Sequence, residues 1–127
     1  TGVFATIDSG SLFDSFYNLK NIANMQYFDT SYTTNMASMF NDCLSIKVID
    51  VSNFDTSKVT NMSNMFRAGN GFSAIDRELL EIIGLENFDT NKVTNMSGMF
   101  ISITKAITLD VTNFDTSNIT DMAHMIR

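Results

Sequence analysis

The chain has 127 residues, 44% of them hydrophobic, which suits one domain with a real core. Its formal net charge is −6 and its eight Lys and Arg residues are scattered, which argues against binding to nucleic acid or to an anionic membrane surface. The single cysteine, Cys43, allows no intrachain disulfide, and no apolar run approaches the roughly 18 residues that span a bilayer. We therefore expect no direct membrane insertion of this fragment, which we interpret, from its start at Thr1, as a piece of a longer protein.

Residues 1–27 form an irregular first coil, after which a repeat begins. Each copy of the repeat is marked by the tripeptide Phe-Asp-Thr, and the ten residues that follow the tripeptide are also similar between copies. The longest spacing between successive tripeptides equals one repeat plus an insertion of eight residues. We interpret residues 1–127 as a single repeat domain whose first coil is atypical because terminal units cap the core. The tripeptide Phe-Asp-Thr marks the copies, with spacings of 26, 34 and 26 residues: Phe28, Phe54, Phe88 and Phe114.

The first half of each unit predicts a β-strand, because apolar, often β-branched residues alternate there. We expect parallel strands over residues 48–52, 82–86 and 108–112. The first copy is looser, with one extra residue between Ile22 and Met25.

The second half of each unit predicts a short helix. Val59, Met62, Met65 and Phe66 fall at i, i+3, i+6 and i+7, which is one face of a helix, and Thr60 precedes it as an N-cap. Such a short helix needs packing to form, so the Phe and Met positions should be buried. The core prediction covers Phe54, Met62, Met65, Phe88, Met96 and Met99.

The insertion falls at about residues 67–79. Gly69 and Gly71 indicate a loop, and Ser73 with Asp76 resembles a capping box that starts a helix. Two interpretations remain open downstream: a helix that ends at Gly84, or a short helix followed by a strand that resumes near Ile82. Stacking favours the strand.

These elements together predict an α/β fold: a leucine-rich-repeat-like right-handed solenoid. Parallel β-strands would line one face and short helices the other, since neither half of a unit can bury its apolar side alone.

The segment NFDTSKVTNMSNMF, preceded by SIKVIDVS and MFNDC, resembles the bacterial surface protein 26-residue repeat family, which is grouped with BspA-like leucine-rich-repeat surface proteins and lipoproteins. The resemblance covers residues 12–127, apart from the insertion. It implies an extracellular location on a bacterial cell surface and a role in adhesion or host interaction.

The recurring Asp29, Asp55, Asp89 and Asp115 allow two interpretations. Stacked carboxylates could bind Ca²⁺, or each Asp could accept backbone N–H bonds in its own turn. The turn is favoured because the tripeptide is the same in all four copies, so we expect no metal and no cofactor. Three Asn residues and one Asp at the start of each second half should also bond the backbone: Asn35, Asn61, Asn95 and Asp121.

Nothing in the sequence favours an enzyme. His124 is the single histidine, Cys43 lacks a basic partner in the sequence pattern, and no G-x-S-x-G motif occurs.

The function should therefore reside in strand positions that point outward and in the insertion. We expect a non-catalytic cell-surface module for adhesion or protein/host interaction, whose partner is a protein or glycan on a host or neighbouring cell. The alternative is a structural spacer in a larger surface protein. The candidate partner surface comprises Val48, Asp50, Ser52, Phe72, Asp76, Ile82, Glu86, Thr108, Asp110 and Thr112.

Overall fold

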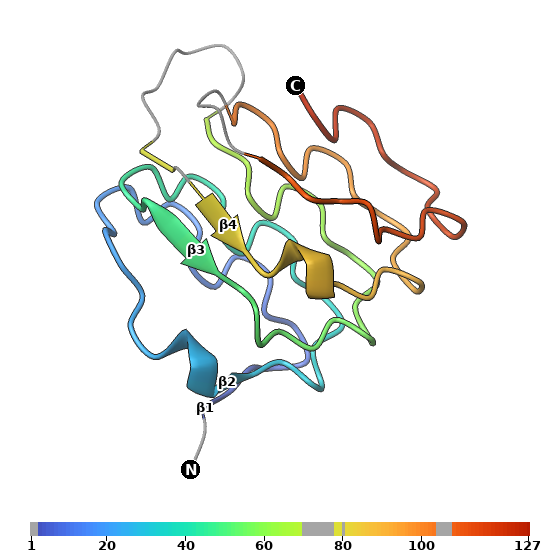
Figure 1. The fold of residues 1–127 in the computed structure, drawn as a ribbon, viewed down its shortest axis with the longest axis horizontal. Helices are drawn as coiled ribbons and strands as arrows, with labels where there is room; N and C mark the ends of the chain where they lie inside the picture. Colours follow the sequence, from blue (N-terminus) through green and yellow to red (C-terminus); the bar gives the residue numbers. More distant parts are fainter. Residues whose placement is uncertain (1–2, 70–77, 80, 104–107) are drawn as a thin grey trace.

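Regular secondary structure is sparse in this chain. The computed structural model describes residues 3–69, 78–79, 81–103 and 108–127. Strands β1 and β2 form one two-stranded parallel sheet, and β3 and β4 form a second one, in which the two strands lie side by side (Figure 1). The elements are β1 (Val3–Phe4), the 3₁₀ helix η1 (Met25–Tyr27), β2 (Phe28–Asp29), β3 (Val48–Asp50), β4 (Glu81–Ile83) and the 3₁₀ helix η2 (Leu85–Asn87).

The predicted leucine-rich-repeat-like right-handed solenoid is wrong. The strands make two separate two-stranded sheets instead of one continuous sheet, and the described part of the chain contains no α-helix. The expected parallel strands near residues 48 and 82 are present, but residues 108–112 form no strand. The insertion is described only at residues 67–69 and 78–79, so the predicted loop at Gly71 and capping box at Ser73 lie outside the described residues.

A left-handed residue explains why the second half of each unit is not helical. Ser38, Asn64 and His124 have φ values of 57°, 55° and 54°, and Gly98 at the corresponding place has 64°. A residue in this conformation cannot continue a right-handed helix. Instead, Met65 N–H bonds back to Met62 O at 3.3 Å in a tight turn, so the apolar spacing arises from a bend.

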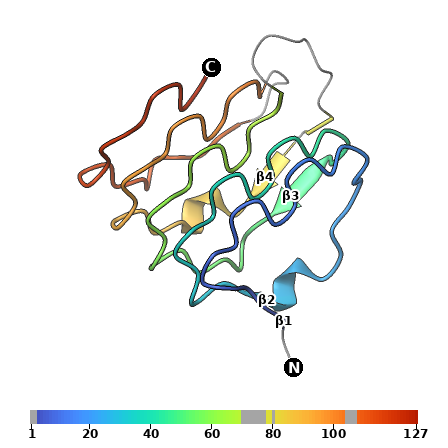
Figure 2. The ribbon, with the colours of Figure 1, turned by 180° about the vertical axis from the view of Figure 1, so that it is seen from behind.

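The bent segments are held by their neighbours. Met62 N–H donates to Asn95 O at 2.9 Å, and Phe66 N–H donates to Met99 O at 3.0 Å. We call this arrangement the bent ladder, and Figure 2 shows its segments side by side in chain order. It comprises residues 8–15, 35–42, 61–68, 95–102 and 121–127, joined by the parallel bridges Asp8↔Asn35, Asn35↔Asn61, Asn61↔Asn95 and Asn95↔Asp121.

The core lies between the bent ladder and the strand halves of the units. The six Phe and Met side chains predicted to be buried are buried, and each is 4% exposed or less. Phe66 stacks between Phe40 and Phe100, with ring centroids 5.7 Å and 5.8 Å away. The aromatic residues therefore form a column that runs through successive units.

Each residue of the Phe-Asp-Thr tripeptide has a different structural role. In the second copy, Phe54 enters the core and the Asp55 carboxylate accepts the Ser57 N–H at 2.9 Å. Thr56 is buried, and its hydroxyl donates to Asp89 O at 3.0 Å while it accepts the Asp89 N–H at 2.8 Å. The tripeptide thus packs one unit, closes its turn and bonds it to the next unit.

The register of β4 differs from the predicted one by one residue. Ile82 pairs with Ile49 and is 7% exposed, so its predicted outward position is wrong, and Ile83 points outward in its place. The physical reason is an extra residue before Phe88, which Gly84 accommodates with a φ of 97° at the start of η2. Asn24, with a φ of 65°, does the same before η1 in the first unit.

Replacing Phe66 with Ala should remove about 3–5 kcal/mol from the free energy of unfolding, because a fully buried ring between two others leaves a cavity. Urea denaturation measures this loss. Phe16 is 54% exposed, and its replacement with Ala is the matched control, with an expected change below about 0.5 kcal/mol. A loss below about 1 kcal/mol at Phe66 would contradict the stacked column.

Replacing Gly84 with Ala should cost at least about 2 kcal/mol. Its φ is unfavourable for Ala, and a Cβ there would lie 2.3 Å from the backbone Cα of Ser52. Asn24→Gly is the comparison, because it keeps the same left-handed conformation without a new contact and should leave stability within about 0.5 kcal/mol. Equal effects of the two substitutions on thermal unfolding would rule out the close approach as the cause.

Candidate functional site

Among the residues that the structure describes, strand β3 is hydrogen-bonded along one edge only. Towards β4, Val51 N–H donates to Ile83 O at 2.8 Å, and Lys47 O accepts the Glu81 N–H at 3.3 Å. Since backbone groups alternate in direction along a strand, the N–H and C=O groups of Val48 and Asp50 point away from β4. Residues 21–26 lie on that side, and no hydrogen bond between described residues joins them to β3.

The open edge faces the first unit, which contains an extra residue. The left-handed Asn24 and the following η1 turn the chain where a strand would otherwise continue. The hydrogen bonds that the described structure shows for residues 19–26 stay local, such as Leu19 N–H to Phe16 O at 3.0 Å and Tyr27 N–H to Asn24 O at 3.0 Å.

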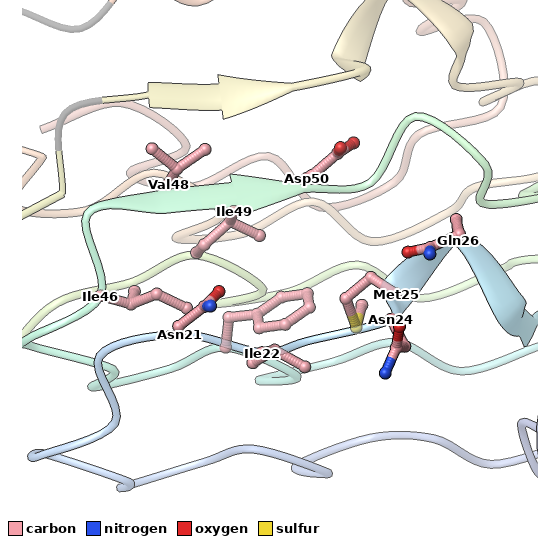
Figure 3. A pocket seen from close by; sticks show the side chains of 10 residues that line it. Asn21, Ile22, Asn24, Met25, Gln26, Ile46, Val48, Ile49 and Asp50 are labelled. Carbon is pink, nitrogen blue, oxygen red and sulfur yellow. The ribbon is translucent and has the colours of Figure 1, made fainter.

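A cleft of about 220 Å³ separates residues 21–26 from β3. Its floor is apolar and buried, and its rim carries three amide side chains and one carboxylate. In Figure 3, Ile49 points towards Ile22 and Met25, whereas Val48 and Asp50 point to the other side of the strand. The floor consists of Met25, Phe40, Ile46 and Ile49, and the rim includes Asn21, Asn24, Gln26 and Asp50.

A second hollow lies on the far side of residues 22–25. It has a volume of about 660 Å³ and is lined mainly by apolar side chains, among them Leu12, Phe13 and Phe28. Ile22, Asn24 and Met25 line both hollows. The segment is therefore a thin wall with space on each side.

Asp50 is charged, whereas the other lining residues that the structure describes are uncharged, and its carboxylate stands at the edge of the cleft on the side of β3 opposite to Ile49. Its carboxylate accepts the Ser52 hydroxyl at 2.6 Å and the Ser52 N–H at 3.0 Å. The hydrogen bond from the Ser52 hydroxyl is the main cause that holds the pKa of Asp50 below its ordinary value, and the bond from the Ser52 N–H adds to it. Some desolvation opposes this lowering of the pKa. Asp50 is therefore ionised at neutral pH and exposed to a partner.

The Asp of each tripeptide closes its own turn, as predicted. Asp29, Asp89 and Asp115 accept the N–H two residues further on at 2.9, 3.1 and 2.9 Å, as Asp55 does. Asn61 likewise accepts the Ser63 N–H at 3.0 Å. Among the described residues, no group of three or more His, Cys, Asp or Glu side chains is arranged to hold a metal ion.

The structure brings only part of the predicted partner surface to the cleft. Val48 and Asp50 line it, and Ile82 is buried. Ser52, Glu86, Thr108, Asp110 and Thr112 are exposed elsewhere, while Phe72 and Asp76 lie outside the described residues. The sequence prediction missed the cleft residues Asn21, Ile22, Asn24 and Gln26, although the extra residue before Met25 was a visible signal.

These features define a class: a repeat protein whose units are joined through backbone hydrogen bonds, with an open strand edge in the second unit. Within that class the chain belongs to the family described as "Mycoplasma protein of unknown function, DUF285", which matches residues 8–79 and again residues 70–127. The match places the repeat in a bacterial family, whereas membership of the BspA-like leucine-rich repeats is not shown. No curated protein and no solved structure matches the chain. In the described residues, no helix has the length and apolar character needed to cross a membrane.

The turn carboxylates predict a loss of stability in acid. Hydrogen bonds from Ser31, Ser57 and Ser117 lower the pKa of Asp29, Asp55 and Asp115 in the folded chain. A lowered folded pKa stabilises the fold above the unfolded value of about 3.9, and this contribution disappears as the pH falls through the folded pKa values.

The free energy of unfolding should therefore decrease between about pH 5 and pH 2. The matched variant has Asn at positions 29, 55 and 115, because an Asn oxygen still accepts the turn N–H but does not titrate. Urea unfolding across this range should show a shallower decrease for the variant. An equally steep decrease would assign the acid sensitivity to other groups.

Proposed function

We propose that this chain is a non-catalytic module of a bacterial cell surface that binds a protein on a host or neighbouring cell. The open edge of β3 beside the apolar cleft carries the proposal, because it offers unused backbone groups and an apolar floor in one place. The resemblance of the repeat to bacterial surface protein repeats supports the extracellular location and the adhesive role.

Most side chains of the repeat pattern already serve the fold, which supports binding at the place where the pattern breaks. The Phe and Met side chains fill the core, the Asp and Asn side chains close turns, and the Thr hydroxyls bond neighbouring units. Few groups of the repeat pattern are left for a partner. The break in the pattern in the first unit is where backbone groups and apolar surface become accessible.

A polypeptide fits the cleft better than a small molecule or a cofactor does. Its volume of about 220 Å³ is below the range of about 300–1,000 Å³ that is usual for small-molecule sites. An edge of a strand, in contrast, binds another chain through its backbone. A glycan would not exploit that edge, so we favour a protein as the partner.

The alternative function is a structural spacer, and the stacking of units through the bent ladder favours it. A spacer needs no partner, so binding separates the two functions.

Biolayer interferometry of the chain against purified host extracellular matrix proteins should give saturable binding to at least one of them. Asp50→Lys should weaken that binding by about tenfold or more, through loss of one charged contact. Asp110→Lys is the matched control, because Asp110 accepts the Thr112 N–H in the same way but lines no part of this cleft. Absence of binding to every protein tested would favour the spacer.

A further inference from the structure

We propose that the cleft binds an extended polypeptide segment as an added strand along the open edge of β3, with an aliphatic side chain on the cleft floor and a basic side chain beside Asp50. This inference rests on the proposed binding function and specifies its partner.

Val48 and Asp50 direct N–H and C=O groups away from β4, towards a side on which no described residue bonds to them. An incoming strand would satisfy these groups in the manner of β-strand addition, in which main-chain bonds supply affinity. Because β3 has three residues, the paired part of the segment is equally short.

The side chains that the segment needs follow from the alternation of the strand. Ile49 points into the cleft, so the residue that lies level with it also points there, beside Phe40 and Ile46. The cleft has room for little more than one aliphatic side chain there.

The neighbouring residue of the segment faces the other way, beside Asp50. Side chains level with one another on adjacent strands are within contact distance, and opposite charges stabilise such pairs. Asp50 is ionised at neutral pH, and the whole chain has a net charge of −6, so a Lys or Arg is favoured at this position. The partner is thus an extended segment with adjacent aliphatic and basic residues.

The wall of the cleft can make room for the added strand. Residues 22–25 have a hollow of about 660 Å³ behind them and, within the described structure, form no hydrogen bond to another unit. Displacing them towards this hollow breaks no backbone hydrogen bond between units in the described structure, and its cost is the packing of Ile22 and Met25 against the core.

The test uses the whole chain and a capped peptide of sequence Thr-Val-Leu-Lys-Thr as the probe. Amide hydrogen exchange at Val48 and Asp50 should slow by about tenfold or more at saturating peptide, because the added strand protects both N–H groups. Exchange at Asp110 should stay unchanged. A peptide with Glu in place of Lys should bind about tenfold more weakly.

Two variants of the chain sharpen the test. Val48→Pro removes one N–H from the open edge while leaving the bonds to β4, a position that edge strands tolerate, and should weaken peptide binding by about tenfold. Val48→Ala keeps the N–H and is its control. If Val48→Pro does not fold, deletion of Asn24 replaces it. This deletion gives Ile22 and Met25 the spacing of Ile49 and Val51, so residues 21–23 should pair with β3 and exclude the peptide.

The outcomes separate the two proposals. Binding to a matrix protein without protection of the Val48 and Asp50 amides would overturn strand addition and leave the proposed function standing. Protection that requires a second copy of this chain, seen as a dimer in sedimentation, would also overturn it. Binding of neither matrix protein nor peptide would overturn both proposals.

Discussion

The backbone hydrogen bonds between units in the bent ladder are the constraint on which the rest of the structure depends. Alternate residues such as Met62, Asn64 and Phe66 donate their N–H groups to the following unit. Because a buried backbone group without a partner is costly, a segment of this shape is stable only beside another one. The apolar column of Phe40, Phe66 and Phe100 follows from this stacking and is not an independent feature.

The sequence predicted correctly what side-chain chemistry alone decides. Burial of Phe54 and Met62 follows from their apolar recurrence, and the turn bond of Asp55 follows from its fixed place in the tripeptide. The helices were predicted wrongly because a bend places apolar residues inward at the same spacing as a helix does. Only the backbone conformation distinguishes a bend from a helix. Ser38 and Asn64 adopt a left-handed φ that their residue types alone do not predict.

The register of β4 and the position of the cleft could not be predicted from the sequence for a related reason. One extra residue before Met25 and one before Leu85 are each absorbed at a left-handed position, Asn24 or Gly84. In the third unit β4 pairs with β3 before the extra residue, whereas in the first unit the corresponding residues do not pair at all. Whether an extra residue prevents a strand from pairing depends on the neighbouring units. The sequence pattern of a single unit does not contain this information.

An open strand edge is a hazard as well as an opportunity, since exposed backbone groups also pair with unwanted chains. The edge of β3 is only three residues long, and the ionised Asp50 stands at its end, both of which are features that limit non-specific pairing. The same carboxylate gives a basic segment an advantage over an acidic one of equal shape, so one group discourages wrong partners and favours a complementary one. In the proposed strand addition, selectivity at this edge would therefore come from charge, while affinity would come from the backbone and the apolar floor.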